Sequence, residues 1–150
     1  MHLVIVSGTV FGTADLVADE AQNFCEAGGL KVSRLKALNL DALLALQPEA
    51  LLVCTSTTGM GELPEPLVPL FHEMRDRFPL FTAVPFGVIA LGDAAYGDTF
   101  CQAGEEFREL LLELQAREIE PMLRLDASET VTLETDAEPW LQRFVVALQG

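Results

Sequence analysis

Strand-like and helix-like segments alternate along the sequence, and this alternation predicts an α/β fold: a doubly wound, five-stranded parallel sheet with helices on both faces. Two observations support the prediction. Short apolar runs such as 3–6 and 50–54 are typical of strands that are covered on both faces. The segments between the runs repeat apolar residues at helical spacing. The 150 residues, 50% of them hydrophobic, suffice for one domain over 1–150 with a sizeable core.

The first half of the chain supplies three strands and two helices. Alternation of polar and apolar residues from Lys31 predicts a more exposed strand, Gly28 and Gly29 end the first helix, and Pro48 stops the second. The predicted elements are a strand (3–6), a helix (16–25), a strand (31–35), a short helix (38–46) and a strand (50–54).

The second half supplies two more strands and three helices. The predicted elements are a helix (67–77), a strand (86–91), an amphipathic helix (101–117), a strand (119–125) and a last helix that contains Trp140 in the core. Pro121 indicates an edge or a bulge in the fifth strand, because proline cannot donate a ladder hydrogen bond. The segment Thr135-Asp-Ala-Glu138 resembles a capping box at the start of the last helix.

Charge excludes one class of partner. Nine Lys and Arg residues stand against 23 Asp and Glu, which gives a net charge of −14. Nucleic acid binding needs clustered cations, so we expect no nucleic acid partner. The acidity either serves solubility alone or steers the protein toward a basic protein surface.

Membrane and metal sites are not expected either. No apolar run reaches the ~18 residues of a membrane span, and the N-terminus lacks the basic start of a signal peptide, so we expect a cytoplasmic protein without membrane contact. Cys25, Cys54 and Cys101 have no metal-ligand or redox-pair spacing, and they are interpreted as small buried hydrophobic residues.

Three loops follow strand ends, where ligands bind in doubly wound sheets: 7–13, 55–64 and 92–100. The first loop offers hydroxyls, two glycines and a helix N-terminus, which suit a phosphate, although an ordinary glycine-rich turn has the same composition. No Lys or Arg occurs in any of the three loops. A phosphate bound there would be held by backbone amides and hydroxyls only.

The other two loops could bind a planar ring. Gly59 and Gly61 permit close backbone approach, so peptide groups of the second loop could hydrogen-bond a ring edge. Tyr96 in the third loop is either an aromatic lid on a heteroaromatic ring or a rim residue that closes the core. A phosphate loop, a ring-edge loop and an aromatic lid at three strand ends are more specific together than each is alone.

In these loops the sequence resembles the flavodoxin family, closest to short-chain flavodoxins of the MioC/YqcA type and to the FMN modules of diflavin reductases. The resemblance rests on residues 7–15, 57–64, 90–96 and 100–107 and covers almost the whole chain. It implies a flavodoxin-like fold with strand order 2-1-3-4-5 and noncovalently bound FMN. An uninterrupted fifth strand would make the protein the short-chain type.

The resemblance also implies the residues of the FMN site. The phosphate would lie against Thr9, Val10, Phe11, Gly12, Thr13 and Ala14. The redox-active ring edge would lie against Thr57, Thr58, Gly59, Met60 and Gly61, and the rest of the pocket against Gly92, Asp93, Tyr96, Phe100 and Cys101. Phe11 and Ala14 stand where many flavodoxins have hydroxyl residues, so weaker FMN binding is expected.

The function implied by the resemblance is electron transfer. A monomeric protein would carry single electrons from an NAD(P)H-dependent flavoprotein reductase to redox acceptor proteins with basic docking faces. No catalytic residue and no metal ligand is predicted, so a carrier is favoured over an enzyme. Two alternatives stay open: an FMN-dependent oxidoreductase acting on quinone-like molecules, and an interaction module of the same fold that has lost FMN.

Overall fold

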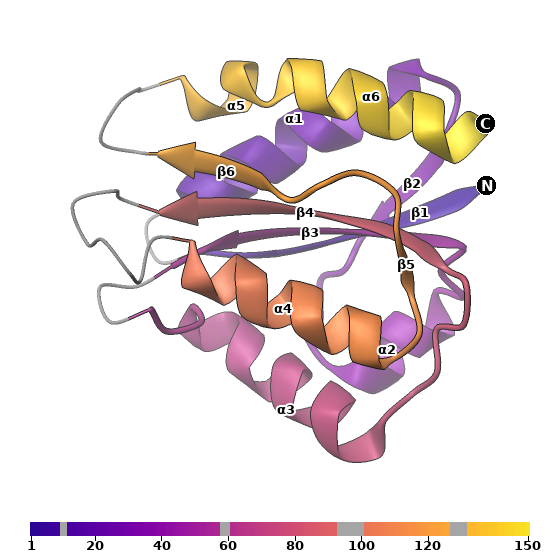
Figure 1. The fold of residues 1–150 in the computed structure, drawn as a ribbon, viewed down its shortest axis with the longest axis vertical. Helices are drawn as coiled ribbons and strands as arrows, with labels where there is room; N and C mark the ends of the chain where they lie inside the picture. Colours follow the sequence, from indigo (N-terminus) through magenta and orange to yellow (C-terminus); the bar gives the residue numbers. More distant parts are fainter. Residues whose placement is uncertain (10–11, 58–60, 93–100, 127–131) are drawn as a thin grey trace.

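The computed structural model describes residues 1–9, 12–57, 61–92, 101–126 and 132–150. A parallel sheet lies in the middle of the molecule, and helices cover both of its faces (Figure 1). Its strands are β1 (His2–Gly8), β2 (Lys31–Arg34), β3 (Ala50–Ser56), β4 (Pro85–Gly92), β5 (Arg117–Glu118) and β6 (Leu123–Asp126). Their order is β2-β1-β3-β4-β5, with β6 also paired to β4, so the predicted order 2-1-3-4-5 is confirmed.

The predicted fifth strand is correct in place but not in continuity. It consists of β5, which pairs with the start of β4, and β6, which pairs with the end of β4. Pro121 lies between them and has no N–H for the ladder. Its carbonyl instead accepts a hydrogen bond of 2.8 Å from the Trp140 indole. The interruption therefore follows from the proline that the sequence already marked.

The helices divide between the two faces of the sheet (Figure 1). One face carries α1 (Thr13–Ala27), α5 (Leu133–Asp136) and α6 (Glu138–Gln149). The other carries α2 (Leu40–Ala45), the 3-10 turn η1 (Glu65–Leu67), α3 (Val68–Arg77) and α4 (Gln102–Glu113). Each face has its own apolar core, because alternate strand residues point to opposite sides: Leu3 and Ile5 to the α1 side, Val4 and Val6 to the α3 side.

Three local predictions were wrong. The helix predicted to reach Arg117 ends at Glu113, because Gln115 turns into the left-handed region at φ 71°. The capping box at Thr135 does not form: Thr135 lies inside α5, and α6 begins at Glu138 without a side-chain cap. Leu16 is one of the apolar residues whose helical spacing predicts the first helix, but it is 57% exposed and lies outside the buried face of α1.

The predictions for the tryptophan and the three cysteines hold. Trp140 is buried, stacks on Phe144 and belongs to the core on the α1 side. Cys25, Cys54 and Cys101 are all buried and free. Among the helices of the described ranges, none has the length and apolarity that crossing a membrane requires.

Candidate functional site

The three predicted loops begin at one edge of the sheet. Because the strands are parallel, β1, β3 and β4 present their carboxyl ends at this edge, and α1 and α4 begin there (Figure 1). Of the predicted site residues, Thr9, Gly12, Thr13, Ala14, Thr57, Gly61, Gly92 and Cys101 are described. The remaining residues lie outside the described ranges: Val10, Phe11, Thr58, Gly59, Met60, Asp93, Tyr96 and Phe100. The binding roles of both groups stay predictions.

The first loop directs backbone donors toward one point. The N–H groups of Gly12 and Ala14 both donate to the Thr9 hydroxyl oxygen, at 2.9 and 3.4 Å. Gly12 has φ 87°, a left-handed conformation that glycine adopts without strain, and it precedes the first turn of α1. Amides that converge on one oxygen at a helix N-terminus form an arrangement suited to an anion.

Tight packing fixes the start of this loop. A Cβ added at Gly8 would lie 2.2 Å from Leu67 Cγ, so no larger residue fits without movement. Ala14 is fully buried in the core on the α1 side. Its methyl group therefore packs in this core.

A cation reaches the first loop from a neighbouring strand. Arg34 at the end of β2 donates from Nη2 to Ser7 Oγ at 3.0 Å, and Nη1 lies 2.6 Å from Asp19 Oδ1. Ser7 Oγ in turn donates to Asp15 Oδ1 at 2.8 Å. The loops themselves contain no Lys or Arg, but the strand order brings Arg34 of β2 beside the first loop.

A cleft of about 610 Å³ lies beside this network. Its lining combines the end of β1, the first turns of α1 and the segment after β2: Ser7, Gly8, Thr9, Asp15, Asp19, Arg34, Leu35, Lys36, Leu38 and Pro66. Charges of both signs thus meet next to the predicted phosphate position.

The second loop begins with an unsatisfied hydroxyl. Ser56 Oγ, at the end of β3, is buried and has no hydrogen-bond partner within the described ranges. The next hydroxyl, of Thr57, accepts a hydrogen bond of 3.3 Å from the Ala103 N–H of α4. Gly61 is buried and has φ 82°, in the left-handed region. A buried hydroxyl without a partner marks a place where a polar ligand group would be stabilised.

The third loop joins β4 to α4 through Cys101. This residue has φ 60° and is fully buried, and its Sγ donates to the Ala90 carbonyl at 3.3 Å. Burial raises the pKa of Cys101 to about 11 despite the opposing effect of Arg124. Burial also raises the pKa of Cys54 to about 12 and that of Cys25 to about 11. All three thiols stay protonated at neutral pH, which suits packing and not nucleophilic chemistry.

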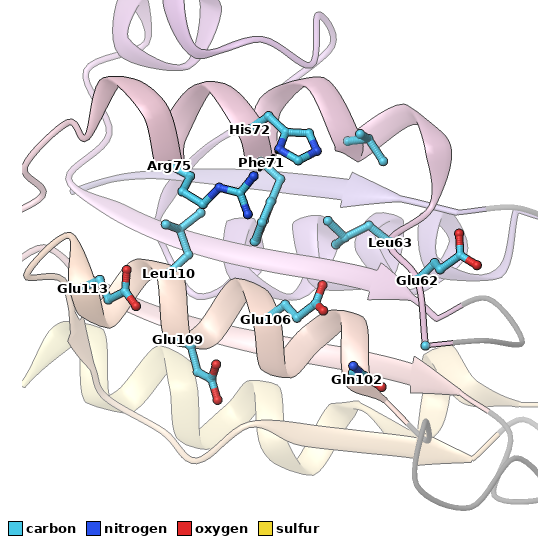
Figure 2. Close-up of a pocket in the computed structure, with 12 residues that line it drawn as sticks. Glu62, Leu63, Phe71, His72, Arg75, Gln102, Glu106, Glu109, Leu110 and Glu113 are labelled. Carbon is cyan, nitrogen blue, oxygen red and sulfur yellow. Dashed lines mark hydrogen bonds between the residues drawn. The ribbon is translucent and has the colours of Figure 1, made fainter.

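An acidic groove of about 490 Å³ runs between α3 and α4, next to the second loop. Phe71 and Arg75 of α3 and Glu106 and Leu110 of α4 reach toward it (Figure 2). The Arg75 guanidinium carbon lies 5.7 Å from the centre of the Phe71 ring. Burial raises the pKa of Glu106. Glu62, Glu109 and Glu113 complete the acidic lining.

Sequence reasoning missed Ser56 and Arg34. Ser56 lies within the predicted second loop, 55–64, but is not among the predicted site residues, although a serine at the carboxyl end of a buried strand was a usable signal. Arg34 is far from the loops in sequence, and only the order β2-β1-β3 places it there. Within the described residues, no group of three His, Cys, Asp or Glu side chains is arranged to hold a metal ion.

The described donors fit the groups of FMN. Converging amides and the Thr9 hydroxyl suit a phosphate, and the unpartnered Ser56 hydroxyl suits a polar group of the same ligand. The site offers main-chain and hydroxyl groups at the ends of β1 and β3, with Arg34 as the nearby cation.

Comparisons with known proteins agree with this geometry. The flavodoxin family model matches residues 5–140. A solved flavodoxin from Pseudomonas aeruginosa is 58% identical, superposes with a TM-score of 0.96, and is covered completely, as is this chain. Flavodoxin YqcA of Escherichia coli is 40% identical over 140 residues, 93% of each chain. The sulfite reductase [NADPH] flavoprotein alpha-component of Mannheimia succiniciproducens is 31% identical over this whole chain and 24% of its own length. The chain belongs to the flavodoxin family, whose cofactor is FMN and whose chemistry is electron transfer.

Proposed function

We propose that this protein carries single electrons from an NAD(P)H-dependent flavoprotein reductase to redox acceptor proteins, with FMN bound noncovalently. The observation that supports this best is the set of converging donors at the first loop, where two amides and the Thr9 hydroxyl meet at the N-terminus of α1. Bound FMN would supply reversible one-electron chemistry, and the protein supplies binding, orientation and electrostatics.

The proposed site residues are those implied by the family. The phosphate lies against Thr9, Val10, Phe11, Gly12, Thr13 and Ala14; the ring lies against Thr57, Thr58, Gly59, Met60, Gly61, Gly92, Asp93, Tyr96, Phe100 and Cys101. Ser56 joins this set as a hydroxyl donor, because its Oγ is buried at the end of β3 and has no partner among the described residues. The Thr57–Ala103 hydrogen bond ties the start of the second loop to the first turn of α4.

The proposed partner surface is the acidic groove between α3 and α4. One end of the groove, with Gly61 and Glu62, lies at the second loop, so a partner that docks along the groove approaches the ring edge. Partners with lysine and arginine faces would be attracted by Glu106, Glu109 and Glu113. The match with a protein named as an NADPH flavoprotein supports a reductase as the electron donor.

The test is FMN binding followed by reduction. The purified protein is titrated with FMN while flavin fluorescence is recorded, and quenching with one FMN per chain is expected. The loaded protein is then mixed with NADPH and a catalytic amount of a flavoprotein reductase. We expect the flavin absorbance to bleach, and to return when an acceptor such as ferric cytochrome c is added.

Each rival function gives a different result in the same assay. An interaction module would bind no FMN at any concentration tested. An oxidoreductase would oxidise NADPH with a quinone and without an added reductase. Either outcome would overturn the proposed carrier function.

A further inference from the structure

Arg34 lies on the sheet face that carries the phosphate loop. Side chains alternate along β2, so Val32 and Arg34 share one face, and Val32 packs against the core on the α1 side. Because β2 pairs with β1, the end of β2 comes beside Ser7 at the end of β1. The fold therefore places a guanidinium next to the first turn of α1.

Three contacts define the position of this charge. Arg34 donates to Ser7 Oγ at 3.0 Å, and Ser7 Oγ donates to Asp15 Oδ1 at 2.8 Å. Arg34 also pairs with Asp19 at 2.6 Å. The Ser7 hydroxyl thus bridges the guanidinium and the carboxylate of Asp15, which belongs to the first turn of α1.

The Asp15 carboxylate would repel a phosphate bound at the first loop. A phosphate monoester carries about −1.5 to −2 charges at neutral pH. At an effective dielectric near 20, a carboxylate about 10 Å away would weaken its binding roughly a hundredfold without salt, and roughly five- to tenfold after screening in about 0.1 M salt. The loop sequences contain no Lys or Arg to compensate. A compensating side-chain charge therefore comes from another element, and Arg34 is bonded to the same hydroxyl as Asp15.

We propose that Arg34 is the countercharge of the phosphate site: through the Ser7 hydroxyl it holds and offsets Asp15, so that a dianionic phosphate binds at the N-terminus of α1. This inference rests on the proposed function. The ion pair with Asp19 is a weaker explanation for the position of Arg34 than a role at the phosphate site. Asp19 has a side-chain exposure of 62%, and exposed ion pairs contribute little to stability.

The experiment compares FMN with riboflavin, which has the same ring and ribityl chain but no phosphate. Dissociation constants for both ligands are measured by fluorescence quenching for the unaltered protein, Arg34→Gln, Arg34→Lys, Asp15→Asn and Asp19→Asn. Circular dichroism and the Tm of each variant report on folding. The quantity of interest is the ratio of riboflavin Kd to FMN Kd.

Arg34→Gln is expected to lower this ratio about tenfold, with riboflavin Kd within about twofold of its original value. Arg34→Lys keeps the charge and retains most of the ratio. Asp15→Asn removes the repulsion and raises FMN affinity, a gain that misfolding cannot produce. Asp19→Asn breaks the same ion pair but leaves the guanidinium, so its ratio stays within about twofold.

Equal losses for both ligands in Arg34→Gln, or no loss, would overturn the inference, as would an Asp19→Asn variant that behaves like Arg34→Gln. An unchanged ratio in Asp15→Asn would overturn it even if Arg34→Gln did not fold. These results leave the proposed function intact, because the unaltered protein would still bind FMN. Failure of the unaltered protein to bind FMN would refute both.

Discussion

At the scale of single residues, we expect the Ser56 hydroxyl to lower the stability of the FMN-free protein and to strengthen FMN binding. Its buried hydroxyl has no partner in the described part of the chain, and such a group is destabilising. We expect Ser56→Ala to raise the free energy of unfolding of the FMN-free protein by about 1 kcal/mol and to weaken FMN binding about three- to tenfold. Urea unfolding and FMN titration measure the two effects.

Ser33→Ala is the matched control for Ser56. The Ser33 hydroxyl lies 2.7 Å from His2 Nε2, so its removal should destabilise the protein and leave FMN affinity unchanged. If Ser56→Ala also destabilised the FMN-free protein, the hydroxyl would have a partner there, and its proposed role toward the ligand would be wrong.

The raised pKa of Cys54 predicts that the protein loses stability at alkaline pH. Burial raises its pKa from 9.0 to about 12, so above pH 9 the unfolded chain releases a proton that the folded chain keeps. The unfolded state then binds fewer protons, and stability falls as pH rises. This thiol should contribute a loss of about 1.4 kcal/mol between about pH 8 and pH 10. Urea unfolding of Cys54→Ala at both pH values should show a smaller drop; an equal drop would contradict the assignment.

At the scale of elements, α4 packs on β4 through a glycine. A Cβ at Gly104 would lie 2.4 Å from the Ala90 Cβ and 3.1 Å from Met122 Sδ. In an exposed helix, Gly→Ala gains about 1 kcal/mol, but overpacking costs about 1–3 kcal/mol. We expect Gly104→Ala to destabilise by about 1–2 kcal/mol in urea unfolding. In an Ala90→Gly background the same change should cost less, and an equal cost in both backgrounds would refute the packing argument.

Elements were predictable wherever one local pattern determined them. The strands 3–6, 50–54 and 86–91 are continuous apolar runs because helices cover both faces of the sheet there. The end of α4 was not predictable, because the amphipathic pattern runs on past Gln115, whose left-handed turn depends on contacts with other segments: Ala83 N–H donates to the Gln115 carbonyl at 3.0 Å. Likewise, Arg34 reaches the site only because β2 pairs with β1. Site residues that lie within one loop could be predicted from the sequence. A site residue that strand pairing brings in from elsewhere in the chain could not.

At the scale of the whole molecule, charged side chains contribute little to the stability of the fold. Two apolar cores, one on each face of the sheet, hold the helices. Several of the described ion pairs have exposed side chains, such as Arg77 with Asp41, and contribute little to stability. We therefore expect the net charge of −14 to act mainly on the surroundings of the molecule, through solubility or through attraction of cationic surfaces.

If partners dock at the acidic groove, its carboxylates should affect the rate of electron transfer more than carboxylates elsewhere on the surface. Glu109→Gln with Glu113→Gln changes the net charge from −14 to −12 at the groove, and Glu20→Gln with Glu26→Gln makes the same change on α1, on the opposite face of the sheet. With a basic-faced reductase at low ionic strength, stopped-flow reduction of the FMN-loaded protein should slow about three- to tenfold for the groove pair and less than about twofold for the α1 pair. Salt near 0.5 M should remove the difference, because the Debye length falls to about 4 Å. Equal slowing by both pairs would mean that net charge alone steers the encounter, and the groove would lose its role as the docking surface.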